Sequence, residues 1–165
     1  SADQVWTATS ATASDFQAGG TNTPACSVYL SADQDITNQT WTKVTFDSEI
    51  YDTHSAFASN KFTVPSGQGG TYNFNTRVKI SGIDDTEYVD SVLYKNGSGV
   101  WNTAKKEYNG GQTDQQLASI VTNQFVLSAG DYIEFYVTHN EGATRPAMGG
   151  TTDGTWMHIY KLIGV

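Results

Sequence analysis

The stretch Phe62-Thr-Val-Pro-Ser-Gly-Gln-Gly-Gly-Thr-Tyr72-Asn-Phe74-Asn-Thr-Arg-Val-Lys-Ile80 decides the fold of this chain. It begins as the end of one strand, turns through a segment rich in Gly, Pro and Ser, and continues as a second strand. In the second strand apolar or small side chains alternate with polar ones, and the alternating set is Tyr72, Phe74, Thr76, Val78 and Ile80. Successive side chains of a strand point to opposite faces, so this pattern predicts a half-buried strand with its aromatic residues on one face.

Strand-like segments recur along the rest of the chain, separated by turn sequences. They cover residues 42–46, 89–94, 116–127 and 132–137. The turn Lys95-Asn-Gly-Ser-Gly99 contains Asn-Gly, which readily accepts a positive φ. We expect Val100-Trp101 to resume a strand and residues 141–155 to form a glycine-rich loop. About eight to ten short strands without a helix favour an antiparallel β-sandwich or barrel.

Residues 1–25 differ in composition from the rest of the chain. Ala, Thr, Ser, Asp and Gly dominate them without a regular period, so we interpret them as an N-terminal arm or linker. The isolated Trp6 and Phe16 could anchor this arm on a neighbouring surface, or the segment could be disordered. Residues 26–165 then form one domain, as a length of 165 residues favours. The Ser1-Ala-Asp start and the apolar last segment lead us to expect a complete small protein.

The net charge and the lengths of the apolar runs limit which kinds of partner the chain can bind. The chain has 17 acidic and 9 basic residues, a formal net charge of -8. Phosphate contacts need clustered Lys and Arg, so we expect no binding to nucleic acid. No apolar run approaches the ~20 residues that span a bilayer and no signal peptide is visible, so we expect no membrane insertion. Cys26 is the only cysteine, and we expect it to be buried, with an intersubunit disulfide as the alternative.

The last strand-like segment has bulky apolar side chains on both faces. One face carries Trp156, His158, Tyr160 and Leu162, and the other carries Met157, Ile159, Lys161 and Ile163. An outer strand of a monomer normally has one wet face, so this segment suggests a partner subunit. The alternative is a central strand that is buried on both faces within one subunit.

A spaced set of residues resembles the signature of a known family. The set is Phe46, Asp52, Phe57, Phe62, Gly70, Tyr72 and Phe74, followed by Leu93-Tyr-Lys-Asn-Gly97 and Leu127-Ser-Ala-Gly-Asp131. In this set the chain resembles the C1q-like globular domain from about Ala25 to Val165. The spacing departs from the family pattern on both sides of Phe62, and Thr76 stands where an aromatic residue is common. The resemblance implies an all-β, antiparallel jelly-roll β-sandwich of about ten strands, of the C1q/TNF-like type.

The resemblance also implies an assembly. Domains of this family form trimers around an apolar axis, so we expect a homotrimer whose axis is lined by Tyr29, Trp156, His158, Tyr160 and Leu162. Members of the family are binding proteins and not enzymes as a rule. They require no cofactor, although several of them hold calcium. Because no collagen-like Gly-X-Y stalk precedes the domain, the chain is most similar to stand-alone bacterial and phage versions.

That similarity predicts a phage virion component, such as a decoration protein, a tail fibre or a receptor-binding protein. The arm, residues 1–25, would dock on other virion proteins, and the jelly-roll head would face a host-surface protein or glycan. Such a protein is made in the host cytoplasm and located in the virion. The alternative is a soluble extracellular protein that binds glycans or proteins without a virion role.

Catalytic and metal-binding motifs are sparse. The chain has no Gly-x-Ser-x-Gly elbow and no His-Glu-x-x-His zinc motif, so we predict that it is not an enzyme. A hydrolase that uses Asp84 or His139 is the remaining alternative. Calcium prefers six to eight oxygen ligands, so we select Asp84 and Asp85 of an acidic loop as candidate ligands, against the alternative of a solvated acidic face.

Aromatic residues beside turns are the candidates for ligand binding. Tyr and Trp rings stack on sugars and fill protein pockets at low entropic cost. On this basis we select Trp101, Tyr108 and Tyr88. The alternative for each is ordinary packing in the core or along the trimer axis.

Overall fold

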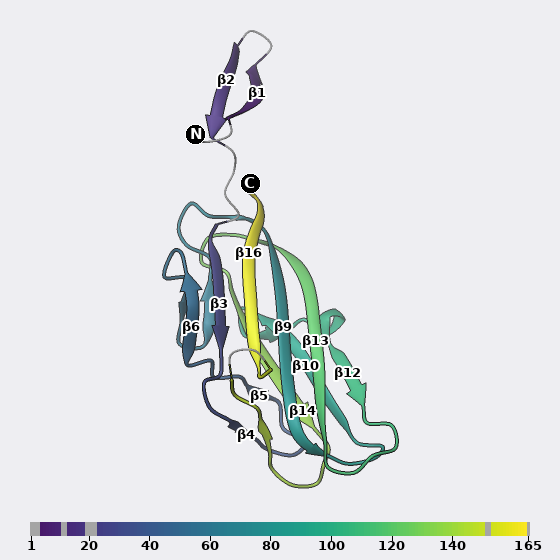
Figure 1. Ribbon diagram of the computed structural model, residues 1–165. Coiled ribbons are helices and arrows are strands. Elements are labelled where there is room, and N and C mark those ends of the chain that lie inside the picture. The colour runs from purple at the N-terminus through teal and green to yellow at the C-terminus, as the bar shows by residue number, and fades with distance from the viewer. Residues whose placement is uncertain (1–3, 11–12, 19–22, 151–152, 165) are drawn as a thin grey trace.

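The chain folds into a two-layer antiparallel β-sandwich that follows an N-terminal hairpin, as a computed structural model shows (Figure 1). The structure describes residues 4–10, 13–18, 23–150 and 153–164, and of residues 4–18, 163 and 164 it describes only the backbone. Two sheets face each other across a single core, so the predicted all-β antiparallel sandwich is confirmed.

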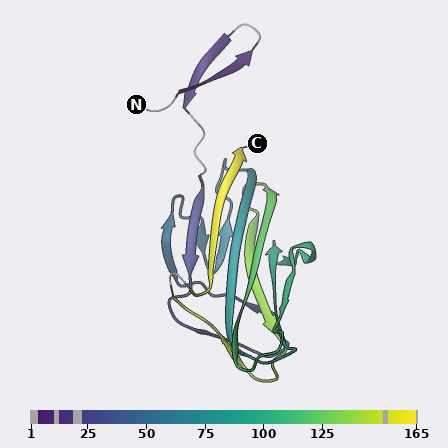
Figure 2. The same ribbon diagram turned by 45° about the vertical axis from the view of Figure 1, so that its right-hand side comes forward.

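We call the first layer the β16 sheet. Its strand order is β4-β15-β9-β16-β3-β6, with β13 also paired to β9. The strands are β3 (Ala25–Tyr29), β4 (Gln34–Ile36), β6 (Ser48–Asp52), β9 (Gly70–Ile83), β13 (Gln115–Leu127), β15 (Arg145–Ala147) and β16 (Trp156–Gly164). The long strands β9, β13 and β16 lie side by side in both views (Figures 1 and 2). Because β16 lies between β9 and β3, it is a central strand of its sheet.

We call the second layer the β14 sheet. Its strand order is β11-β10-β14-β8-β7, with β12 paired to β10 and β5 paired to β14. The strands are β5 (Thr42–Lys43), β7 (Phe57–Ala58), β8 (Lys61–Thr63), β10 (Tyr88–Lys95), β11 (Ser98–Gly99), β12 (Lys105–Tyr108) and β14 (Tyr132–His139). A 3-10 turn, η1 (Trp101–Thr103), joins β11 to β12.

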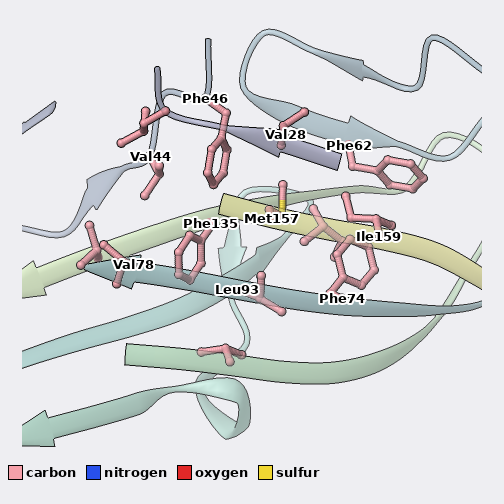
Figure 3. Packing of buried hydrophobic residues seen from close by; sticks show 14 of the residues in the cluster. Val28, Val44, Phe46, Phe62, Phe74, Val78, Leu93, Phe135, Met157 and Ile159 are labelled. Carbon is pink, nitrogen blue, oxygen red and sulfur yellow. The ribbon is translucent and has the colours of Figure 1, made fainter. Parts of the chain in front are cut away.

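The stretch that decides the fold supplies the centre of the core. Its five alternating residues are all fully buried, as predicted: Tyr72, Phe74, Thr76, Val78 and Ile80. The ring of Phe62 meets the rings of Tyr72 and Phe74 at centroid distances of 5.5 and 5.9 Å. Figure 3 shows Phe62 and Phe74 in the same cluster as Phe135 from the opposite sheet. The aromatic residues of the deciding stretch therefore hold the two layers together.

Asp52, one of the residues in which the chain resembles the C1q-like domain, closes the turn between β6 and β7. Its Oδ2 accepts a hydrogen bond from the Phe57 N–H at 2.7 Å, and its Oδ1 accepts one from the His54 N–H at 3.3 Å. The Phe57 ring then reaches Phe46 at a centroid distance of 6.1 Å. The spacing of Phe46, Asp52 and Phe57 in the sequence thus reflects one turn that carries an aromatic ring back to the core.

Three local predictions were wrong. Residues 101–103 form η1 and not a strand, because Thr103 Oγ1 donates to the Val100 carbonyl at 2.8 Å and accepts from the Leu93 N–H at 3.1 Å. The region expected as a glycine-rich loop contains β15, which pairs with β4. The described sandwich has fourteen strands and not about ten, since six of them have only two or three residues.

The segment expected as an arm or linker contains a β-hairpin. Its strands are β1 (Gln4–Ser10) and β2 (Ala13–Ala18), which form a two-stranded sheet of their own. Trp6 and Phe16 are backbone partners in this pair. Their side chains lie outside the described part, so the expected anchoring on a neighbour stays a prediction. Figures 1 and 2 show the hairpin beyond the end of the sandwich.

Candidate functional site

The outward face of the β16 sheet carries the residues selected for the trimer axis. Along β16, Met157 and Ile159 point into the core and are fully buried. Trp156, His158 and Tyr160 point outward between them, and each is partly exposed. The segment is therefore a central strand, as the alternative to a partner subunit proposed. Its outward side remains partly exposed, because no described part of the same chain covers it. Its aromatic residues are available to a partner.

Neighbouring strands widen this face. Tyr29 of β3 is the register partner of Trp156, and Tyr51 of β6 is the register partner of Ser27 in β3. On the other side, Ile120 of β13 lies level with Trp156 through their common partner in β9. Tyr51 and Ile120 are 47% and 51% exposed. Leu162 is also partly exposed, but it lies at a bulge toward the end of β16.

His158 occupies the middle of this face and has no charged partner among the residues that the structure describes. Its Nδ1 lies 2.7 Å from Ser27 Oγ, and its ring lies over Trp156 with a centroid distance of 4.4 Å. Its register partner in β9 is Asn75, another neutral side chain. Burial lowers the pKa of His158, because the surroundings disfavour the charged ring. The imidazole is therefore neutral at pH 7.

Two positive charges of β9 lie on this face, and they share one carboxylate partner. Arg77 Nη2 lies 2.9 Å from Asp153 Oδ1, and Lys79 Nζ contacts Asp153 Oδ2. These two contacts lower the pKa of Asp153, Lys79 having the larger effect. Among the described residues that share the outward face of β3, β16 and β9, the only charged groups are these paired cations.

The predicted calcium ligands support loops instead of converging on one point. Asp84 Oδ1 accepts a hydrogen bond from the Asp114 N–H at 2.8 Å, and Asp85 Oδ1 accepts one from the Gly111 N–H at 2.6 Å. Within the described ranges, no three His, Cys, Asp or Glu side chains are grouped so that they could hold a metal ion. Calcium therefore gains no support from the arrangement of Asp84 and Asp85.

The aromatic residues selected for ligand binding separate into two groups on the outward face of the β14 sheet. Tyr88 and Tyr108 form one pair, with ring centroids 5.7 Å apart, and Lys106 Nζ lies 4.0 Å from the centroid of Tyr88. Trp101 belongs to a different group toward the other end of β10. Between the two groups lies the ion pair of Lys106 and Asp90, with a separation of 3.5 Å.

The group around Trp101 contains Tyr94, which also flanks a turn, and Trp41 and Tyr136, which the sequence did not single out. Trp101 meets Trp41 at a centroid distance of 5.5 Å and Tyr94 at 6.1 Å, and Tyr94 stacks on Tyr136 at 4.0 Å. We call Trp41, Tyr94, Trp101 and Tyr136 the four-ring cluster. One signal could have pointed to it: in residues 132–137 the apolar residues alternate with Tyr132, Glu134 and Tyr136, which places aromatic rings on the outward face.

The three histidines and the cysteine do not form a reactive group in the described structure. His139 is fully buried, and its Nε2 lies 2.9 Å from the Ile36 carbonyl oxygen. His54 is exposed and contacts Thr53 Oγ1 at 2.9 Å. Cys26 is buried as expected, and this burial raises the pKa of its thiol to about 12. In the described part of the chain no helix is long and apolar enough to cross a membrane.

Comparison with known proteins identifies the fold. No family model matches the chain, and no curated protein matches it. Among solved structures, the globular domain of the zebrafish complement 1qA protein is similar with a TM-score of 0.60 and 15% identity, covering 86% of this chain and 99% of that domain. The Eiger TNF from S. frugiperda is similar with a TM-score of 0.63 and 12% identity, covering 86% of this chain and 93% of that protein.

Both similarities are too low in identity to carry more than the fold. They show that the chain is an all-β jelly roll. More particularly, it has the C1q/TNF-like domain fold that the sequence resembles.

Proposed function

We propose that the protein is a non-enzymatic binding protein that assembles as a homotrimer through the outward face of the β16 sheet. The observation that carries this proposal is the chemistry of that face. Trp156, Tyr160 and Tyr29 lie together on it, and its cations are already paired with Asp153. The charged groups of β3, β16 and β9 on this face are two cations with one shared carboxylate, so on a chain of net charge -8 the face carries none of the negative excess that would repel another copy.

The energetics favour burial of this face. Each large apolar side chain that becomes covered contributes about 1.5–3 kcal/mol. His158 is neutral and Ser27 already shares a hydrogen bond with it, so their burial leaves no charge without a partner. Three copies, and not two, are proposed because the C1q-like family that the sequence resembles forms trimers.

The mass of the native protein tests this proposal. At micromolar concentration we expect light scattering and native mass spectrometry to give the mass of three chains of 17.9 kDa. Tyr160→Glu places a charge on the face, two residues along β16 from His158, and should yield monomers. The matched control is Tyr108→Glu, which changes an aromatic residue of 62% exposure on the other sheet and should remain trimeric. A wild-type monomer, or a trimer that survives Tyr160→Glu, would contradict the proposal.

The more specific role is a phage virion component whose arm docks on a neighbouring virion protein. One observation supports this role for the arm. The β1–β2 hairpin pairs with no strand of the sandwich in the described structure. An isolated two-stranded hairpin is marginally stable in water, so packing against a partner would stabilise it. In this role the protein is located in the virion and its head meets a host-surface protein or glycan.

A soluble extracellular binder is the alternative to the virion role. Removal of residues 1–22 distinguishes the virion role from the extracellular role. A virion component should lose its association with particles while the head stays trimeric. An extracellular binder should keep its ligand and show no association with particles in either form.

A further inference from the structure

The four-ring cluster lies on the outward face of the β14 sheet, the layer opposite to the proposed trimer face. Trp101 is 58% exposed there, which is unusual for so large an apolar ring. Figures 1 and 2 show β10 and β14 on the far side of the sandwich from β16. The cluster therefore remains open to solvent when three copies join through the β16 sheet.

The cluster is held in place by the local backbone. Trp101 begins η1, which the Thr103 hydroxyl fastens to the Val100 carbonyl and the Leu93 N–H. A Cβ atom added to Gly99 would lie 2.9 Å from Cε2 and Cζ2 of Trp101, so the indole ring rests directly on the glycine backbone. An aromatic ring fixed before binding loses little entropy when a ligand arrives.

Val92 shows that the rings form a small apolar layer of their own. It is on the outward side of β10, where its register partner is Tyr136, yet it is fully buried. It does not belong to the cluster of buried residues between the two sheets. The rings on this face therefore cover Val92. We call the four-ring cluster together with the Val92 side chain beneath it the platform.

The charges around the platform are matched. Lys43 Nζ lies 2.9 Å from Glu134 Oε1, and Lys106 Nζ lies 3.5 Å from Asp90 Oδ2. Each of these two cations has a carboxylate partner, and Lys61, a further cation of this sheet, lies over the Tyr132 ring, 4.2 Å from its centroid. Both cations that border the four rings are therefore compensated, although the chain as a whole carries -8. This balance favours a neutral ligand, since a charged one would meet no uncompensated opposite charge.

Polar atoms next to the platform still have hydrogen-bonding capacity. Asp90 Oδ1 and Thr138 Oγ1 are buried and without a hydrogen-bond partner among the described residues. Asp90 and Thr138 are register partners, and continuation of the pairing between Thr42 and Val137 brings Trp41 level with Thr138. Because Asp90 Oδ1 is enclosed by the protein, a ligand can reach this carboxylate only at Oδ2, which lies 3.5 Å from Lys106 Nζ in a side chain that is 13% exposed. A carboxylate oxygen only accepts hydrogen bonds, so the ligand should supply a donor to Oδ2.

From these observations we propose that the four-ring cluster binds a neutral carbohydrate. A pyranose ring has an apolar C–H face that stacks on Trp101, and hydroxyl groups that both donate and accept at its edge. A proline-rich peptide also stacks on aromatic rings, but its prolines have no N–H to donate to Asp90. This inference rests on the proposed function only in that it names the ligand class of a binding protein.

A glycan array with neutral and anionic structures, probed with the full-length protein, identifies the carbohydrate. Titration of the best neutral oligosaccharide then follows tryptophan fluorescence, because Trp41 and Trp101 are in the platform. A proline decamer and a sulfated oligosaccharide are titrated in parallel. We expect saturable binding of a neutral oligosaccharide, a shift in tryptophan emission, and at least about tenfold weaker binding by Trp101→Ala.

Two further variants locate the site. Gly99→Ala keeps the backbone but displaces the Trp101 ring, so we expect binding to weaken several-fold. Ile50→Ala removes an exposed apolar side chain of β6, outside the cluster, and should bind like the wild type. A thermal melt of each variant confirms that it is folded.

Failure of every neutral glycan on the array, or binding that is unchanged in both Trp101→Ala and Gly99→Ala, would overturn the inference. So would binding of the proline decamer or of the sulfated oligosaccharide alone. The oligomeric state of the same samples keeps the two proposals apart. A trimer that binds no neutral glycan contradicts only this inference, whereas a monomer that binds one contradicts only the trimer.

Discussion

The outward faces of the two sheets are both rich in aromatic residues, but they differ in how those residues are arranged. On the β16 sheet Tyr29, Trp156 and Tyr160 are spread among neutral polar side chains across neighbouring strands. On the β14 sheet the rings of the four-ring cluster touch one another and lie between ion pairs. A dispersed aromatic face suits contact with another large surface, whereas a compact cluster suits a small ligand. The core between the sheets determines the fold, and the two outward faces carry the two proposed interactions.

The largest expected effect is a loss of stability from a change in the core, which supports the outward faces of both sheets. Phe74 is fully buried, and its ring contacts Phe62 and Phe125. Phe74→Ala should lower the free energy of unfolding by about 3–5 kcal/mol, because a cavity remains between the sheets. Urea denaturation measures this loss, with Ile50→Ala, at a side chain of 58% exposure, as the exposed control at about 0.5 kcal/mol or less. A loss below about 1 kcal/mol for Phe74→Ala would contradict the shared core.

A pair of tryptophan substitutions compares the two faces directly. Trp156→Ala removes an aromatic ring from the proposed interface and should weaken the trimer by about 1.5–3 kcal/mol per chain. Trp101→Ala should leave trimer dissociation unchanged and affect only carbohydrate binding. Dilution measured by light scattering or mass photometry reports the dissociation. Equal effects of the two substitutions would remove the distinction between the faces.

Acidification should weaken the β16 face and not the β14 face. Because the pKa of His158 is lowered in the folded chain, the unfolded chain takes up its proton first as the pH falls. The stability that neutral His158 contributes is complete above the ordinary pKa of about 6.5 and is lost as the pH falls through its lowered value. Thermal melts between neutral and acidic pH should show this loss, and His158→Gln should remove it. His54→Gln is the control, and an equal response of both variants would count against His158.

Calcium should have the smallest effect. The side chains of Asp84 and Asp85 already accept hydrogen bonds from backbone N–H groups, and both residues are exposed. We therefore expect millimolar calcium to leave the melting temperature of the wild type unchanged. A clear rise in melting temperature that disappears in Asp84→Asn would show instead that the sequence had indicated a true calcium site.

The sequence predicted best what depends on local alternation. The burial of every second residue from Tyr72 to Ile80 and the inward direction of Ile133, Phe135 and Val137 follow from a two-residue period that any paired strand imposes. The Asn-Gly turn after β10 was also visible, because Asn96 and Gly97 both adopt a positive φ.

What the sequence did not predict depends on tertiary contacts. The 3-10 turn at Trp101 forms because its ring packs on Gly99 and Thr103 bonds to β10, and neither contact has a local pattern. The four-ring cluster combines residues from four separate segments, so no single stretch of the sequence predicted it. The β1–β2 hairpin was missed because its strands are poor in apolar residues.

The place of β16 in its sheet has a consequence for biosynthesis. Every other strand of the sandwich precedes it in the chain, yet β9 and β3 meet only through it. Until the ribosome has released this strand, the nascent polypeptide keeps two open hydrogen-bonding edges and cannot close its sandwich. The proposed trimer face is thus complete only after translation has passed residue 164.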